Sequence, residues 1–284
     1  MKPVLTQEIK DLRGKSLVPK DTKILEWANK HIFTSEYMKK KSKFKEVPSF
    51  LEDCESVFQR DPYDKVLKNW VKNFRSWLGE IWAPSIIFDE LRVLKSLDPY
   101  SYRHVLTIAV VGSRLLEIWI KATPTVKRSF QAFICHRLGK ARMSQILLQK
   151  KEALDDAEKR IIYEQPLVGF VLNASYWGNA NHLCAKVALQ HQEDRLGKGY
   201  PCGIKTNSLV LDILHLLDRF DALISERPFR YKKFSVREAL DLMKEDADSG
   251  RMEEDVLKAF MDLVRTESLK DYKKLKFGTI GRPK

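Results

Sequence analysis

The stretch SLVLDILHLLDRFDALI, from Ser208 to Ile224, is apolar on nearly every side of the helix that its spacing predicts. A helix of this kind is deeply buried in a folded domain. His215, Asp218 and Asp221 nevertheless follow one another at intervals of three residues and share one face of it. Buried carboxylates need a cation, an arginine or hydrogen-bond donors. The stretch therefore predicts either a binding site or an internal salt-bridge network in the core.

The same helical spacing governs the chain upstream of this stretch. One helix is predicted from about Ile86 to Leu97 and a second from about Ser101 to Ile120, with the turn Asp98-Pro99 between them. His104 lies on the apolar stripe of the second helix and is expected to face the interior; alone, it is more typical of a hydrogen-bonded core histidine than of a ligand. No convincing strand pair or hairpin signal is found, so the sequence predicts an all-α protein.

The first 85 residues are predicted to form an N-terminal helical segment, ahead of a longer helical domain over residues 86–284. A helix that ends before Pro84 carries an apolar stripe made of Val66, Trp70, Phe74, Trp77 and Ile81. Aromatic rings bury large apolar areas, so we expect the segment to pack on the longer domain. The basic run KKKSKFK, Lys39 to Lys45, is expected to be a solvated loop.

Composition narrows the class of protein. The 284 residues are 44% hydrophobic and carry a formal net charge of +13, which suits a folded core and anionic partners, although a basic balance can equally serve solubility. The four cysteines are far apart and form no CxxC pair, so a zinc ribbon is disfavoured. No run of about 18 apolar residues occurs, so we expect no membrane span and a cytoplasmic location. Nucleic-acid binding rests on charge alone and is disfavoured.

Six segments of the longer domain together resemble an HD-GYP domain in order and spacing. They are DPYSYRHVLTIAVVG (98–112), FICHRLGK (133–140), ILLQKKEALDDAE (146–158), EQPLVGFVL (164–172), HQEDRLGKGYPCGIK (191–205) and LLDRFDALISERPFR (216–230). The resemblance covers Asp98 to about Val264 and leaves out the first 85 residues. It implies the all-α helical bundle of the HD superfamily, in which bacterial members hydrolyse cyclic di-GMP at a two-metal centre.

The resemblance implies which metal ligands are kept and which are replaced. His104, His136, His191 and Asp218 match metal ligands of the family. Arg137 stands in place of the aspartate that bridges the two metals, Gln165 and Gln192 replace two histidines, and Leu196 replaces an aspartate of the Gly-Tyr-Pro loop. Arginine stays protonated and has no acceptor atom. We therefore expect no normal two-metal site and assign no catalytic residue; the alternatives are one weakly held iron or manganese ion, or no metal, which is favoured.

The resemblance also points to residues that contact nucleotides or partners. The residues matched to nucleotide or phosphate contacts are Lys140, Lys150, Asp221, Arg227 and Arg230. Gly199, Tyr200 and Pro201 match the loop that is linked in this family with docking to diguanylate cyclase domains. Helix capping or folding roles explain the same cations and glycines without any ligand.

Together these features predict a bacterial signalling module that binds cyclic di-GMP or a related nucleotide, a partner protein, or both, without efficient hydrolysis. The alternative is a residual cyclic di-GMP phosphodiesterase with an altered or mononuclear metal site. Metal content would separate the two. A further expectation concerns charge: with the bridging carboxylate gone, the buried Asp218 needs a positive partner, and Arg137 is expected to supply it.

Overall fold

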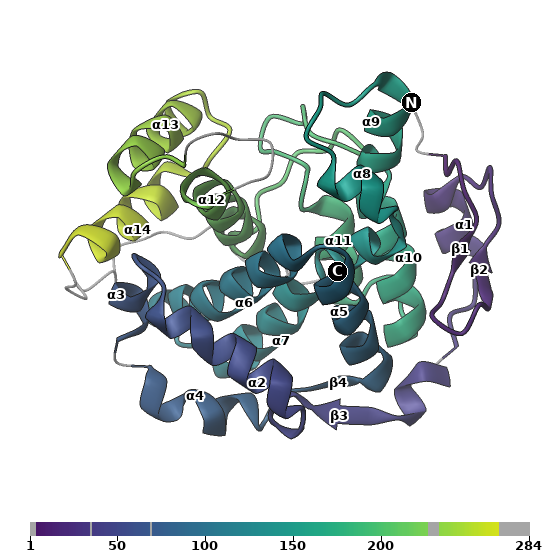
Figure 1. Ribbon diagram of the computed structural model, residues 1–284, viewed down its shortest axis with the longest axis horizontal. Coiled ribbons are helices and arrows are strands. Elements are labelled where there is room, and N and C mark those ends of the chain that lie inside the picture. Colours follow the sequence, from purple (N-terminus) through teal and green to yellow (C-terminus); the bar gives the residue numbers. More distant parts are fainter. Residues whose placement is uncertain (1–3, 35, 69, 227–232, 267–284) are drawn as a thin grey trace.

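The computed structural model describes residues 4–34, 36–68, 70–226 and 233–266. Helices dominate the fold, and two short antiparallel ribbons lie at its rim (Figure 1). The all-α expectation is confirmed. Within the described part of the chain, no helix is both long and apolar enough to cross a membrane.

Short strands and 3-10 helices (η) are interspersed with α-helices in the first third of the chain, and α-helices dominate the rest. From the N-terminus, the elements are β1 (Ile9–Lys10), β2 (Ser16–Val18), α1 (Ile24–Lys30), η1 (Glu36–Lys39), β3 (Lys41–Lys43), η2 (Phe44–Glu46), α2 (Pro48–Glu55), η3 (Ser56–Gln59), α3 (Tyr63–Leu67), α4 (Val71–Leu78), β4 (Trp82–Pro84), α5 (Ser85–Leu97), α6 (Pro99–Ile120), α7 (Thr123–Cys135), η4 (Leu138–Arg142), α8 (Gln145–Gln149), α9 (Asp156–Tyr163), α10 (Gln165–Trp177), α11 (Leu183–Gln190), α12 (Leu209–Ile224), α13 (Val236–Asp248) and α14 (Glu254–Thr266).

Two helical hairpins and one crossing helix build the centre of the fold. The helices predicted upstream appear as α5 and α6, and the stretch from Ser208 to Ile224 appears as α12, which packs on α6. Asp98 caps α6 by accepting the backbone N–H of Ser101 at 2.9 Å. Lys121, in the left-handed conformation with φ of 51°, ends α6 and turns the chain into α7. The hairpin of α10 and α11 packs on α7 and completes the core.

A glycine sets the distance between the end of α7 and the start of α10. A Cβ atom on Gly139 would lie 2.1 Å from the carbonyl oxygen of Gln165 and 2.8 Å from the backbone nitrogen of Gly169. No residue with a side chain fits there without moving backbone. The absence of a side chain thus brings η4 against α10 and places Arg137 beside Gln165, both on the wall of one cavity.

The N-terminal segment is less helical than its sequence predicts. β1 pairs with β2, and the basic run expected to be a loop instead supplies β3, which pairs with β4 so that Lys41 lies opposite Pro84. The three residues of β3 are polar and give no alternation of apolar side chains. Lys41 nevertheless gains a partner in the ribbon, because its amine lies 4.3 Å from the centre of the Trp82 ring.

The predicted aromatic stripe is buried, but it is not one helix. Trp70 and Phe74 are almost fully buried, and Trp77 is partly buried against Phe130 of α7 at 5.3 Å between ring centres. The chain between residues 63 and 84 forms α3, α4 and β4 in succession, and Ile81 lies after the second of these helices. The stripe therefore joins the N-terminal segment to the same hydrophobic core as the central helices.

Candidate metal centre and adjoining cavity

Three buried histidines lie next to one another, with ring centres 6.1 Å apart for His104 and His136 and 5.3 Å apart for His136 and His191. His104 lies within α6, while His136 and His191 follow the ends of α7 and α11. Each ring has its Nδ1 atom beside an oxygen: Asp221 Oδ2 at 2.6 Å, the carbonyl of Phe133 at 2.6 Å and the carbonyl of Ala188 at 2.8 Å, respectively. An Nδ1–H donated to such an oxygen fixes the ring and leaves Nε2 for a ligand, as in metal-binding histidines.

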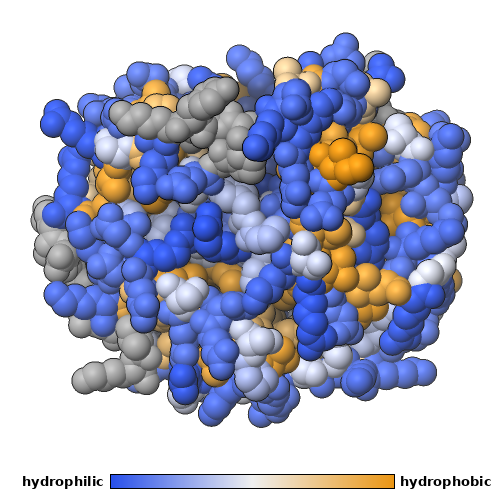
Figure 2. Space-filling model, in the orientation of Figure 1, coloured by the Kyte–Doolittle hydropathy of each residue, from blue (hydrophilic) through white to orange (hydrophobic). Residues whose placement is uncertain are grey.

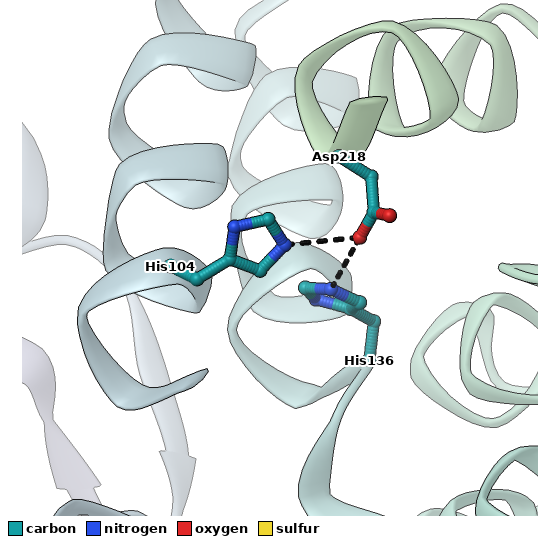
Figure 3. Close-up of side chains that lie close together, drawn as sticks. All are labelled: His104, His136 and Asp218. Carbon is teal, nitrogen blue, oxygen red and sulfur yellow. Dashed lines mark hydrogen bonds and ion pairs between the residues drawn. The ribbon is translucent and has the colours of Figure 1, made fainter. Parts of the chain in front are cut away.

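The Nε2 atoms of His104 and His136 face Asp218 of α12. Asp218 Oδ1 lies 2.9 Å from His104 Nε2 and 4.0 Å from His136 Nε2, as the close-up shows (Figure 3). One ligand atom from each of the three residues falls within 4.8 Å of the others. The ring centres of His136 and His191 are 5.3 Å apart, and His191 Nε2 is buried without a hydrogen-bond partner among the described residues. The structure thus brings three of the predicted metal ligands, His104, His136 and Asp218, within ligand distance of one another, and places the ring of His191 next to that of His136.

The guanidinium of Arg137 lies beside the same Asp218 carboxylate and His136 ring. Its guanidinium donates a hydrogen bond to Asp218 Oδ1, and its Nε lies 3.2 Å from His136 Nε2. The prediction that Arg137 pairs with Asp218 is therefore confirmed. Burial alone raises the pKa of Asp218, but Arg137 and His104 outweigh it and hold that pKa well below its usual range. The Asp218 carboxylate is consequently ionised, and the positive charge of Arg137 balances its negative charge.

Among the described residues, the donor set of His104, His136 and Asp218 can hold one divalent ion. Imidazoles and a carboxylate suit manganese, iron or zinc, and the ring of His191, whose Nε2 has no partner among the described residues, is centred 5.3 Å from that of His136. Arg137 lies beside this donor set and adds a positive charge to it. The side-chain nitrogen of Gln165 is turned to the carbonyl of His136 at 3.4 Å, so it does not offer an oxygen there. A single ion would share Asp218 with Arg137 or displace it.

Asp221 lies behind His104 rather than in the cavity. Its carboxylate is 1% exposed, and besides His104 it accepts the hydroxyl of Tyr63 at 2.9 Å and Nη2 of Arg60 at 3.1 Å. Burial raises the pKa of Asp221, but its partners, led by His104, lower it to about 2. Its predicted contact with a nucleotide thus has no geometric support. Arg60 and Tyr63 escaped the sequence analysis, because no periodicity or motif marks them.

A cavity of about 490 Å³ opens next to Arg137. Its polar lining consists of Arg137, Lys140, Lys150, Lys151, Glu152, Gln165, Gln192 and Tyr200, and its apolar lining of Met143, Leu147, Leu148, Ala153, Leu154 and Ile162. Volumes of this size are typical of small-molecule sites. Figure 2 shows hydrophobic side chains exposed over α8, which contributes to the lining, among hydrophilic neighbours.

The predicted nucleotide-binding residues are only partly gathered at this cavity. Lys140 is held by Asp98 Oδ2 at 3.1 Å and Ser101 Oγ at 2.6 Å. Lys150 lies 2.7 Å from both carboxylate oxygens of Glu158. Both lysines line the cavity, whereas Asp221 does not. Arg227 and Arg230 lie outside the described residues.

The Gly-Tyr-Pro loop, residues 191–203, closes one side of the cavity. A Cβ atom on Gly199 would lie 2.3 Å from the carbonyl oxygen of Gln192, and the backbone N–H of Tyr200 donates to that oxygen at 3.0 Å. The buried Glu193 accepts the backbone N–H groups of Cys202 and Ile204 at 2.6 and 3.0 Å. Pro201 follows directly. The loop is thus held so that the Tyr200 ring lines the cavity, 4.6 Å from the ring of Tyr163.

Comparison with known proteins agrees with this geometry. The family described as HD domain matches residues 120–256, which include His136, His191 and Asp218. The chain carries an HD-GYP-like domain. This domain is similar to cyclic di-GMP phosphodiesterases of Thermotoga maritima (27% identity, 61% of this chain and 50% of the relative) and Pseudomonas aeruginosa (28%, 66% and 45%).

A third relative is named for a different cyclic dinucleotide. A 3'3'-cGAMP-specific phosphodiesterase of Vibrio cholerae is 28% identical over 60% of this chain and 36% of its own length. The chain therefore spans half or less of the length of these three curated relatives. All three carry names of cyclic dinucleotide phosphodiesterases. HD domains of this kind are metal-dependent, which agrees with the His and Asp cluster of the HD-GYP-like domain.

The buried histidines of the HD-GYP-like domain predict acid sensitivity. Burial, followed by the charge of Arg137, lowers the pKa of His191 from 6.5 to about 3, and burial likewise lowers the pKa of His136. The unfolded chain binds these protons below pH 6.5 and the folded chain does not, so stability falls as the pH drops below about 6.5. Each such histidine contributes up to about 1.4 kcal/mol per pH unit.

Urea unfolding in EDTA between pH 7.5 and 5.0 measures this effect. His191→Gln is expected to reduce the pH dependence, while His31→Gln, at an exposed position, is expected to leave it unchanged. A free energy of unfolding that stays constant over this range would contradict the prediction.

Proposed function

We propose that the HD-GYP-like domain binds cyclic di-GMP or a related cyclic dinucleotide in the cavity beside Arg137, and acts as a bacterial signalling module without efficient hydrolysis. The observation that carries the proposal is the guanidinium of Arg137, which neutralises Asp218 and also lines the cavity. A fixed cation thus stands where the domain would otherwise place its metals.

The cavity suits the two chemistries of a cyclic dinucleotide. Arg137, Lys140 and Lys150 line the cavity, each paired with a carboxylate of the chain, and their remaining N–H groups can donate to phosphodiester oxygens. Tyr200 and the apolar side chains of α8 supply surfaces on which bases pack. The two neutral amides of Gln165 and Gln192 also line the cavity and offer hydrogen bonds of either sense.

The second candidate is a cyclic di-GMP phosphodiesterase with a mononuclear site. The names of the relatives favour it over a module that does not hydrolyse. In this alternative, His104, His136, His191 and Asp218 would hold one ion. Such an ion, when bound, polarises a phosphate oxygen and activates water. Arg137 would then leave Asp218 and stabilise charge on the phosphate.

We further propose that Gly199, Tyr200 and Pro201 dock onto a diguanylate cyclase domain in the cytoplasm. Because Tyr200 lines the cavity, a partner that moves this loop would change the nucleotide site, and a bound nucleotide would change the docking surface. The basic charge of the chain supports an anionic ligand, and a nucleotide accounts for it more economically than nucleic acid does.

Calorimetric titration with cyclic di-GMP, in EDTA and again in Mn²⁺, tests the proposal. We expect saturable binding of one cyclic dinucleotide in both conditions. Lys150→Ala removes a charged contact and should weaken binding about tenfold or more. Lys159→Ala is the matched control, because Lys159 pairs with Asp156 at 3.1 Å on α9 and does not line the cavity. Absence of binding in both conditions would refute the proposal.

A further inference from the structure

Two residues of the N-terminal segment, Arg60 and Tyr63, contact the carboxylate of Asp221, which faces the ring of His104. Asp221 Oδ1 accepts both the Tyr63 hydroxyl at 2.9 Å and Arg60 Nη2 at 3.1 Å, while Oδ2 faces His104 Nδ1 at 2.6 Å. Tyr63 is fully buried and Asp221 is 1% exposed. The two donors on Oδ1 fix the rotamer of the Asp221 carboxylate. The orientation of this carboxylate in turn fixes the orientation of the His104 ring, which contacts Oδ2.

The two hydrogen-bond donors to Asp221 come from a different part of the chain than the candidate metal ligand His104. Tyr63 begins α3 and Arg60 follows η3, whereas His104 lies on α6 and Asp221 on α12. α3 packs on α6, which carries His104, and on α14. Arg60 also donates a hydrogen bond to the Thr107 hydroxyl on α6. The segment is therefore attached to the same helix as His104 at two points.

We propose that Arg60 and Tyr63 are positioning residues through which the N-terminal segment sets the orientation of His104. A shift of η3 and α3 turns the Asp221 carboxylate, which in turn moves the His104 ring relative to Asp218. Loss of an outer partner of a metal-binding histidine commonly lowers metal affinity 10- to 100-fold. The inference rests on the proposed function only in that it takes His104 as a residue of the site.

A second buried hydrogen-bond network, around Glu90, provides a control that distinguishes an effect on the His104 ring from an effect on fold stability. Glu90 is fully buried and accepts hydrogen bonds from Arg142 and from the Tyr176 hydroxyl. It thus repeats the combination of carboxylate, arginine and tyrosine, but its bonds lead to α10 and η4 and not to the imidazole of His104. Tyr63→Phe and Tyr176→Phe remove the same kind of hydrogen bond, and they should lower stability alike.

The experiment follows the His104 ring directly. Ring nitrogen and proton resonances of His104 are recorded by NMR in the metal-free protein and assigned by His104→Gln. Tyr63→Phe and the double variant Tyr63→Phe/Arg60→Met should shift these resonances in increasing order, and Tyr176→Phe should leave them in place. This readout needs neither metal nor nucleotide, so it stays decisive even where cyclic di-GMP fails to bind.

Cobalt binding supplies a second readout. We expect Tyr63→Phe to weaken Co²⁺ affinity about tenfold relative to the parent, and Tyr176→Phe to change it less than about twofold. Unchanged His104 resonances in the double variant overturn the proposal. So do equal shifts in Tyr63→Phe and Tyr176→Phe, because they would show that the Tyr63 hydrogen bond acts only on the stability of the fold.

Discussion

Replacement of Arg137 by alanine is expected to lower the free energy of unfolding by roughly 3–5 kcal/mol. The Arg137 side chain is 10% exposed and bonds Asp218, whose carboxylate is 21% exposed. Removal of the guanidinium leaves this carboxylate inside the protein without its main cation, and the solvation it lost on folding is no longer compensated. Chemical denaturation at pH 7.5 in EDTA measures the loss.

An arginine–carboxylate ion pair on the surface, Arg75 with Glu55, provides the control. Arg75 bonds Glu55 with its side chain 64% exposed, and exposed pairs contribute about 1 kcal/mol or less. Arg75→Ala should therefore cost far less than Arg137→Ala. Added Mn²⁺ should stabilise the Arg137→Ala variant more than the parent, because the ion can then take the vacated place. Equal losses in the two variants would show that Arg137 does not compensate Asp218.

Hydrolysis of cyclic di-GMP under Mn²⁺ loading is expected to be at least about 10³-fold slower than by the Thermotoga maritima relative. Two unit charges 4 Å apart interact by about 4 kcal/mol at an effective dielectric of 20, and each 1.36 kcal/mol is a factor of about ten in rate. On the proposal that Arg137 takes the place of a bridging aspartate, it both removes that anion and adds such a charge. A product assay on both proteins, side by side, measures the ratio.

Back-substitution makes this test sharper. On the same proposal, Arg137→Asp alone should not restore turnover, because the resemblance places Gln165 and Gln192 where two histidines would bind metal. The triple variant that also carries Gln165→His and Gln192→His should bind two metal ions and gain turnover. Parental turnover within about tenfold of the relative, abolished by His136→Ala, would establish the phosphodiesterase alternative instead.

Helices and ligands were predictable where one signal repeats along the sequence. The apolar spacing of α6 and α12 gave their limits to within about two residues, and the order of six segments related His104 to Asp218 across more than one hundred positions. The ribbon of β3 and β4 had no such signal. It pairs Lys41 with Pro84, and neither of its three-residue strands alternates apolar with polar side chains.

The orientation of side chains within the site was not predictable either. Asp218 and Asp221 share one face of α12 by spacing, so both were expected at the ligand side. The crossing of α12 over α6 decides between them: Asp218 meets His104 at Nε2, and Asp221 meets the same ring at Nδ1. Tyr63 completes that arrangement from 158 residues away, a separation at which spacing carries no information.

The positive charge beside Asp218 is part of the polypeptide, so it is present whether or not a metal ion is available. Iron changes oxidation state and is withdrawn by chelators, and manganese rises and falls with growth conditions. The guanidinium of Arg137 is made with every copy of the chain and cannot be oxidised or exchanged in this way. If the cavity binds a cyclic dinucleotide as proposed and Arg137 serves as its cation, the affinity of that binding would not depend on the concentration of a metal ion.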